Sequence, residues 1–195
     1  MRPLPVLMRA LWRELKVSRT RLLRLYFGFD KWHVYAQTKP SYVDIVHSCA
    51  NTLQKKDVVL EVGCGLGNLI TGCNFSSRIA IDNSSEVIKA AKFLNYFHSK
   101  KVMFLHGSFE EALRFENIDC LILVNWIHNL TPIQLENSIR EMYGKSLNSN
   151  SYIISEGIAH YRNYHNKEFF SKFGEILEES LIDDREVFLI KVTSL

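Results

Sequence analysis

Hydrophobic and polar residues follow two different periods along the chain, and the changes of period predict its elements. Short apolar runs bounded by turn residues are typical of buried strands, whereas apolar residues three or four positions apart indicate amphipathic helices. The first pattern predicts strands at 57–62, 78–81, 102–105, 120–124 and 152–155. The second predicts helices at 4–27, 41–54, 84–99, 131–145 and 166–173, with a helical turn at 109–114.

The alternation of strands and helices after residue 57 predicts an α/β fold, in which helices cover both faces of a parallel sheet. Near the end of the chain, two runs at 176–181 and 187–192 flank a polar segment and indicate an antiparallel hairpin, although the first run is also compatible with a helix. The aromatic segment 31–42 is predicted to be irregular. We therefore expect a basic helix and an aromatic lid segment over 1–40, followed by one domain over 41–195.

The loop after the first strand carries the strongest functional signal. Glu61 lies in an apolar run, and Gly63, Gly65 and Gly67 follow at alternate positions. Glycines here let the backbone turn tightly and approach a ligand, and their N–H groups are expected to meet an anionic group of that ligand. A dinucleotide fingerprint has the spacing G-x-G-x-x-G, which would need a third glycine where this chain has Asn68. A nicotinamide-dependent oxidoreductase is therefore a disfavoured alternative.

An acid, one residue and then G-x-G-x-G after the first strand resembles the first motif of the class I S-adenosylmethionine-dependent methyltransferases, and Glu61, Gly63, Gly65 and Gly67 match it. The resemblance covers about residues 40–195. It implies a Rossmann-like, seven-stranded sheet that ends in an antiparallel hairpin, S-adenosyl-L-methionine as the cofactor, and methyl transfer as the reaction. A non-catalytic cofactor-binding partner or scaffold subunit stays open, because a binding motif does not establish turnover.

Further candidate ligands lie at the carboxyl ends of the strands, where open α/β sheets bind their ligands. Asp82 is suited to accept hydrogen bonds from both ribose hydroxyls, although a role as a turn or cap residue is the alternative. Ser108 stands where the family usually has an acid that contacts the adenine amino group, and Phe109 is placed to pack on the ring. The candidate cofactor-binding residues are Glu61, Gly63, Cys64, Gly65, Gly67, Asp82, Asn83, Ser108, Phe109 and Asn125.

Two histidines are candidate catalytic bases. A hydroxyl acceptor benefits from a general base, and histidine titrates near neutral pH. His128 follows the fourth strand and His160 follows the fifth, so both are expected at the ligand-binding edge, although each ring could instead be purely structural. The candidate substrate or lid residues are Trp32, His33, Tyr35 and Tyr161.

Composition narrows the class of protein. Of the 195 residues, 47% are hydrophobic and 23% are charged, as in soluble globular proteins. No apolar stretch approaches the roughly 20 residues needed to span a membrane, and we expect no secretory signal, because prolines and arginines interrupt the first residues. None of the four cysteines belongs to a C-x-x-C pair, so we predict no metal site and expect a cytoplasmic protein with free thiols.

The positive charge is concentrated in the N-terminal segment. Residues 1–31 carry eight basic and two acidic side chains, a net charge of +6, whereas the whole chain carries +3. The helix predicted there is compatible with packing on the domain, with peripheral contact to anionic lipid at the inner membrane face, or with binding to phosphate groups. No nucleic-acid motif is present, so nucleic acid is not expected as a partner.

A second, short resemblance suggests the class of molecule that accepts the methyl group. Residues 27–33 are similar to the lead-in of small methyltransferases found with bacterial surface-polysaccharide enzymes. This resemblance implies O-methylation of a small molecule or glycan hydroxyl. The short chain leaves no room for an inserted substrate domain, which keeps a homodimer or a borrowed acceptor site open.

Overall fold

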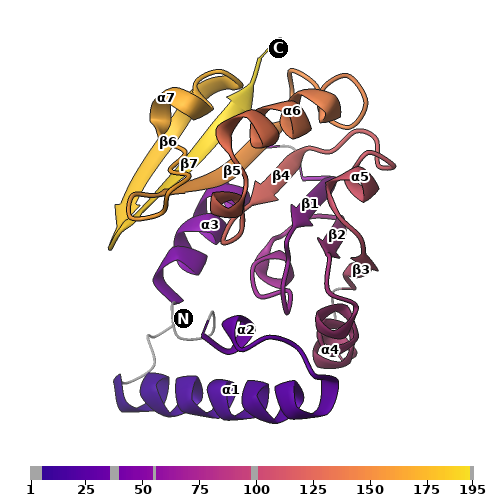
Figure 1. Cartoon of the computed structure of the whole chain (residues 1–195), viewed down its shortest axis with the longest axis vertical. Coiled ribbons are helices and arrows are strands. Elements are labelled where there is room, and N and C mark those ends of the chain that lie inside the picture. The colour runs from indigo at the N-terminus through magenta and orange to yellow at the C-terminus, as the bar shows by residue number, and fades with distance from the viewer. Residues whose placement is uncertain (1–5, 36–39, 55, 98–100, 194–195) are drawn as a thin grey trace.

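A seven-stranded sheet forms the centre of the computed structural model, which describes residues 6–35, 40–54, 56–97 and 101–193 (Figure 1). The strand order is β3-β2-β1-β4-β5-β7-β6. Strands β1 to β5 pair in parallel, and β7 is antiparallel to both β5 and β6. The strands are β1 (Val58–Val62), β2 (Ser77–Asp82), β3 (Met103–His106), β4 (Cys120–Leu123), β5 (Tyr152–Ile158), β6 (Gly174–Ile182) and β7 (Arg185–Val192).

Helices cover both faces of this sheet, which confirms the predicted fold class. Successive residues of β1 point to opposite faces, so Val59 packs in the cluster that includes α3 and Leu60 packs in the cluster that includes α6 and α7. The helices are α1 (Val6–Phe27), α2 (Trp32–Tyr35), α3 (Pro40–Thr52), α4 (Ser85–Asn95), α5 (Phe109–Ala112), α6 (Pro132–Met142) and α7 (Lys167–Phe170). Single 3-10 turns lie at η2 (Ile70–Gly72) and η3 (Ile127–Asn129).

Local signals fix the ends of α6. The hydroxyl of Thr131 accepts the N–H of Gln134 and the Gln134 side chain accepts the Thr131 N–H, which forms a capping box with Pro132 at the first helical position. Gly144, with φ of +80°, follows the last turn in the left-handed conformation that favours glycine. Sequence signals of this kind are local, which is why they predict this helix.

One prediction about elements was wrong, because the aromatic segment expected to be irregular contains the short helix α2. The predicted C-terminal hairpin was confirmed, since the run with both strand and helix character is the strand β6, antiparallel to β7. In β6, partly buried and exposed positions alternate along the whole strand, which is the period-2 pattern of an edge strand covered on one face.

Helix α1 lies across one end of the domain, next to α2 and α4 (Figure 1). Its inward side chains Val17 and Leu23 pack with Leu66 of the glycine loop and with Val87 of α4. Leu11, Leu15 and Leu22, which belong to the apolar stripe that predicted the helix, are exposed instead. Within the described ranges, no helix combines the length and the hydropathy required to cross a bilayer.

Candidate functional site

The glycine loop joins β1 to the turn η2 in a conformation that requires glycine. Gly63, Gly65 and Gly67 have φ values of +74°, +53° and +81°, all in the left-handed region. A Cβ atom built on Gly63 would lie 2.1 Å from Cδ1 of Trp126. The first glycine is therefore needed both for its backbone conformation and for close contact with an aromatic ring.

The N–H groups of this loop are used within the protein. Those of Gly63 and Cys64 both donate to the carbonyl of Ile81, at 2.8 Å and 3.0 Å, and that of Gly67 donates to the carbonyl of Cys64 at 2.9 Å. The contact of these glycine N–H groups with an anionic ligand group stays a prediction. The hydrogen bonds hold the loop against the end of β2.

Asp82 joins the ends of β1 and β2. Its Oδ2 accepts the N–H of Gly65 at 2.9 Å, and its Oδ1 accepts the N–H of Ser84 at 3.0 Å. Because β1 and β2 are parallel neighbours, their carboxyl ends meet at one edge of the sheet. The glycine loop and this acid, both candidate cofactor-binding elements, therefore lie together at that edge.

Glu61 lies beneath the loop. Its side chain is buried, and Oε2 accepts the N–H of Ile70 at 3.0 Å. Burial raises the pKa of Glu61 well above its ordinary value and nearby Asp82 adds to the effect, while the N–H of Ile70 opposes it. In this position the carboxyl group supports the backbone of the loop.

Two aromatic side chains cover the loop from outside. A Cβ atom on Gly65 would lie 3.1 Å from Nδ1 of His33, so α2 places this histidine directly over the loop. Burial lowers the pKa of His33, against the influence of Asp82 and Asp30. On the other side, Trp126 Nε1–H donates to the carbonyl of Val62 at 2.5 Å.

Trp126 was not among the predicted site residues. It follows β4 at the same sheet edge as the predicted Asn125, so its position after a strand was the available signal. The ring of the predicted Phe109 lies 5.6 Å from the Trp126 ring, centroid to centroid. These two rings and the glycine loop form the side of the site nearest to α5.

Other predicted cofactor residues are placed in different ways. The thiol of Cys64 is buried and donates to the carbonyl of Gly65 at 3.5 Å, and burial raises its pKa well above the ordinary value. Asn83 is exposed, and its carbonyl lies 3.1 Å from a ring nitrogen of His106. Ser108 is exposed, and its hydroxyl donates to the carboxylate of Glu110.

The predicted lid residues do not act as one group. Trp32 of α2 is 66% exposed, whereas His33 is partly buried against the loop. Tyr35 ends α2, and its side chain lies outside the part of the chain that the structure describes. His33 is the predicted lid residue that the structure places against the glycine loop.

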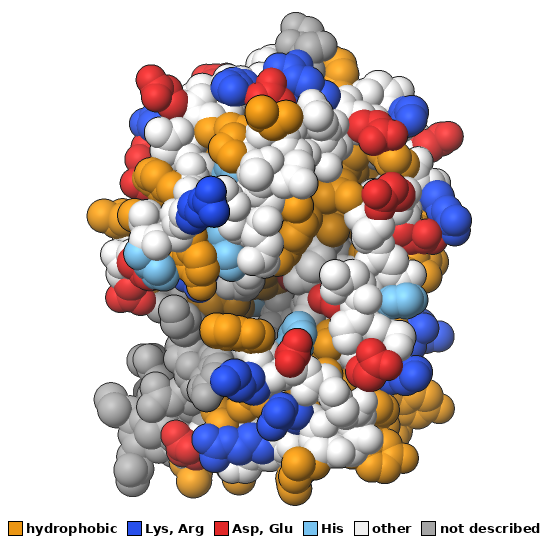
Figure 2. All heavy atoms as spheres, viewed as in Figure 1, with side chains coloured by type: hydrophobic (Ala, Val, Ile, Leu, Met, Phe, Trp, Pro, Cys, Tyr) orange, Lys and Arg blue, Asp and Glu red, His pale blue; other side chains and the backbone are white. Residues whose placement is uncertain are grey.

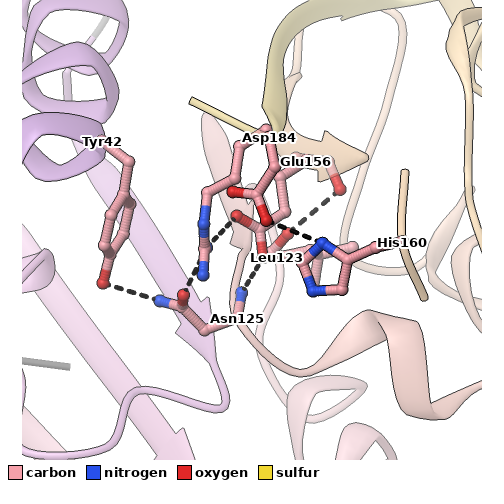
Figure 3. Close-up of polar contacts among 8 residues, drawn as sticks. Tyr42, Leu123, Asn125, Glu156, His160 and Asp184 are labelled. Atoms are coloured by element: carbon pink, nitrogen blue, oxygen red, sulfur yellow. Dashed lines mark hydrogen bonds and ion pairs between the residues drawn. The ribbon is translucent and has the colours of Figure 1, made fainter. Parts of the chain in front are cut away.

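A polar network surrounds Asn125 at the end of β4 (Figure 3). The residue has φ of +72°, its N–H donates to Glu156 at 2.5 Å, and its side chain joins Tyr42 at 2.8 Å and Arg185 at 2.7 Å. Arg185 also bonds Glu156 at 2.7 Å and lies 4.9 Å from the centroid of the Tyr42 ring. The network ties β4 to β5, β7 and α3, and it occupies the Asn125 side chain.

The two candidate bases lie on either side of one tyrosine. The ring of His128 stacks on that of Tyr161 at 3.9 Å, and the ring of His160 lies 4.6 Å from it. Nδ1 of His128 is buried and has no hydrogen-bond partner among the described residues. Burial lowers the pKa of His128, and Arg185 and two other histidines add to the effect. The geometry favours a neutral imidazole at neutral pH.

His160 has a different environment. Its Nδ1 lies 2.7 Å from Oδ2 of Asp184, in the turn between β6 and β7, and its side chain is 56% exposed (Figure 3). The ring is therefore held by a surface carboxylate. Among the residues with described placement, no cluster of three or more histidine, cysteine or acidic side chains could hold a metal ion.

Comparison with known proteins identifies the domain. Residues 59–145 match a family model described as a methyltransferase domain, and this range runs from β1 to the end of α6. This segment of the chain is therefore similar to methyltransferase domains. No curated protein matches it significantly in sequence.

Several solved structures share the fold of this chain. Magnesium protoporphyrin IX methyltransferase (ChlM) from Synechocystis PCC 6803 is 12% identical with a TM-score of 0.66, over 94% of this chain and 96% of ChlM. N-methyltransferase NodS from Bradyrhizobium japonicum WM9 is 14% identical with a TM-score of 0.63, over 79% of this chain and 87% of NodS. TehB from Haemophilus influenzae is 13% identical with a TM-score of 0.61, over 77% of this chain but only 62% of TehB.

Proposed function

We propose that this protein is an S-adenosyl-L-methionine-dependent methyltransferase that methylates a hydroxyl oxygen of a small molecule or glycan. The observation that carries the proposal is the carboxylate of Asp82, held against Gly65 at the shared end of β1 and β2. An ionised carboxylate fixed there can accept the two hydroxyls of a ribose. The related structures of ChlM and NodS were determined with S-adenosylmethionine and S-adenosylhomocysteine respectively, which supports the choice of cofactor.

The residues present fit this cofactor. Asp82 would hold the ribose, and the Phe109 and Trp126 rings offer an apolar wall for the adenine. His33 and Trp126 would border the methionyl part above Gly65 and Gly63. The bound cofactor would supply an activated methyl group on a sulfonium sulfur, and the protein would have to align the acceptor with it.

His128 is the better-placed base of the two candidates. Its pKa is lowered by burial, and its ring is fixed by stacking on Tyr161, so the neutral form is ready to take a proton from a hydroxyl. His160 is exposed and its ring is held by Asp184, which suits contact with the acceptor at the edge of the site better than proton transfer. The polar aromatic side chains beside His128 match an acceptor with several hydroxyl groups.

The strand order argues against the nicotinamide-dependent alternative. Dinucleotide-binding sheets of the doubly wound type have the order 3-2-1-4-5-6. Here the antiparallel strand β7 stands between β5 and β6, and it forms with β6 the final hairpin that the resemblance to methyltransferases implied. Asn68, in place of the third glycine of the dinucleotide motif, argues in the same direction.

Calorimetric titration with S-adenosylmethionine, S-adenosylhomocysteine and NAD tests the proposal. Binding of the two sulfur compounds, its loss in Asp82→Ala, and methylation of a sugar in an acceptor screen with labelled cofactor would support it. Binding of NAD alone would refute it. Binding of the sulfur compounds without turnover of any acceptor would favour the alternative of a non-catalytic cofactor-binding subunit.

A further inference from the structure

Helix α1 presents an apolar stripe to solvent. The spacing of three, four or seven residues along the helix places its members on one side. The opposite side carries Val17 and Leu23, which pack against the domain. The exposed members are Leu11 (61% exposed), Leu15 (54%), Leu22 (68%), Leu25 (79%) and Tyr26 (83%).

Aromatic residues of α4 and its end extend this stripe. The Phe27 ring lies 5.9 Å from that of Phe93, which joins the end of α1 to α4. Phe93 is 64% exposed, Tyr96 78% and Phe97 93%. Exposed apolar side chains gathered in this way mark an interaction site. We call the side chains of Leu11, Leu15, Leu22, Leu25, Tyr26, Phe93, Tyr96 and Phe97 the α1–α4 surface.

Positive charge accompanies this surface. Lys16, Arg19, Arg21 and Arg24 on α1 are all exposed. Figure 2 shows lysine and arginine side chains gathered over the end of the molecule where α1 lies, with hydrophobic side chains protruding at its lower edge. Residues 1–31 carry a net charge of +6 while the whole chain carries +3, so the rest of the chain is net negative.

Apolar and basic groups together select the kind of partner. A second copy of the chain at this surface would bring two strongly positive segments together, which like-charge repulsion opposes. Nucleic acid would be attracted by the arginines but would leave the leucines and aromatic rings in water. An anionic lipid bilayer satisfies both, because acyl chains take up the apolar side chains and headgroups attract the cations.

We propose that the α1–α4 surface binds an anionic membrane, with α1 lying in the headgroup region parallel to the bilayer. Tyrosine and phenylalanine at its edge are suited to this interface. The inference does not depend on methyl transfer. It does have a consequence for access to the site, since α2, which places His33 over the glycine loop, lies next to α1 (Figure 1).

Sedimentation of the full chain with lipid vesicles tests the inference. We expect binding to vesicles of phosphatidylcholine mixed with phosphatidylglycerol, weaker binding to phosphatidylcholine alone, and a marked loss of binding at high salt. The double variant Leu22→Gln/Leu25→Gln should reduce the partition coefficient at least about tenfold. Arg19→Gln/Arg21→Gln should reduce it about twentyfold on the anionic vesicles.

Matched control variants distinguish binding by this surface from non-specific binding by any exposed apolar side chain. Leu177 and Leu181 of β6 are 47% and 74% exposed but lie outside the α1–α4 surface, so Leu177→Gln/Leu181→Gln should bind as the wild type does. All substituted side chains are exposed, and circular dichroism should show unchanged folding.

Three outcomes would overturn the inference. The first is a wild-type protein that does not sediment with anionic vesicles. The second is undiminished binding by Leu22→Gln/Leu25→Gln. The third is a wild-type protein that does not bind vesicles and forms a dimer, while Leu22→Gln/Leu25→Gln is a monomer. That result would make the surface an interface between copies of the chain. Cofactor binding is measured separately, so failure here leaves the proposed methyl transfer untouched.

Discussion

Asp82 at the end of β2 accepts the N–H of Gly65 at 2.9 Å, and this bond connects the glycine loop to the neighbouring strand. The second oxygen of the same carboxylate accepts the N–H of Ser84 at 3.0 Å. Both oxygens are therefore fixed in place by the backbone. An acceptor that is already oriented loses little freedom when a ligand binds, so under the proposed function this carboxylate would be preorganised for the ribose diol.

Replacing Asp82 by asparagine tests its ligand role with little change of shape. The amide oxygen of Asp82→Asn can keep the Gly65 bond, but the amide nitrogen can accept neither the Ser84 N–H nor a hydroxyl. We expect S-adenosylmethionine to bind about 10- to 100-fold more weakly, because one or more charge-assisted bonds worth about 1.5–3 kcal/mol are lost. Calorimetry measures the affinity, and the exposed substitution Asp44→Asn is the control. Wild-type affinity in Asp82→Asn would contradict the ribose role.

Gly63 should be far less tolerant of a side chain than Gly144. Both have positive φ, at +74° and +80°, and alanine in that conformation costs about 1–2 kcal/mol. Only at Gly63 would the added Cβ also meet Trp126, at 2.1 Å, whereas no atom lies within 4 Å at Gly144. We expect Gly63→Ala to destabilise the fold clearly more than Gly144→Ala and to change tryptophan fluorescence. Urea unfolding and emission spectra measure both effects, and equal stability losses would contradict the close contact.

The glycine loop and the strand ends could be predicted because their signals are local. Apolar runs mark the strands, and Glu61 with the alternate glycines marks the turn after β1. The Asn125 network could not be predicted, because it joins side chains 60 and 83 positions apart in the chain. The face of α1 that packs on the domain could not be predicted from the sequence either. Apolar residues line both sides of that helix, and periodicity does not tell which side meets the domain.

Arg185 should be important for stability through its buried partner. It bonds Glu156 at 2.7 Å, and the two side chains are 12% and 0% exposed. Arg185→Leu leaves a buried carboxylate without its cation, which typically costs about 3–5 kcal/mol. The double variant Arg185→Leu/Glu156→Gln should recover part of that loss, because the charge is removed as well.

Urea unfolding of these variants gives the test, with a surface pair as the control. Arg140 and Glu136 form an ion pair at 3.0 Å whose side chains are 44% and 24% exposed. Arg140→Leu should change the free energy of unfolding only slightly. If Arg185→Leu proved as mild as Arg140→Leu, the network around Asn125 would not stabilise the sheet edge.

Glu61 should make stability fall as pH rises. Burial raises its pKa well above the ordinary value, so the folded protein holds a proton that the unfolded chain releases above about pH 4.3. Its stabilising contribution is complete below that unfolded pKa, and it is lost as the pH rises toward the folded pKa, at up to about 1.4 kcal/mol per pH unit. Glu61→Gln keeps an acceptor for the Ile70 N–H and should abolish this trend.

Unfolding in urea at a series of pH values measures the difference between Glu61→Gln and the wild type. The advantage of the variant should grow with pH up to the folded pKa of Glu61. The exposed substitution Glu116→Gln should show no such growth, since its side chain is in solvent. A difference between Glu61→Gln and wild type that does not vary with pH would mean that Glu61 ionises normally in the fold.

His128 should determine the acid limb of the pH–rate profile, where the rate falls as the pH falls. A general base acts when neutral, so the rate should fall as the pH falls through the pKa of its imidazole. Because burial and the nearby Arg185 lower that pKa from 6.5, the limb should lie on the acid side of 6.5 and the base should be fully available at neutral pH. His128→Gln should lower kcat about 10²- to 10⁴-fold and remove the acid limb of the pH–rate profile, while cofactor affinity stays unchanged.

His160→Gln is the matched control for this prediction. His160 shares the Tyr161 ring with His128, but it is 56% exposed and held by Asp184, so its loss should affect kcat much less. The formation of S-adenosylhomocysteine with the acceptor found in the screen gives the rates. The titration of each imidazole by NMR gives the pKa without any need for turnover. A His128 pKa at or above 6.5 would contradict the prediction. So would an acid limb that persists in His128→Gln, because another group would then take the proton from the acceptor hydroxyl.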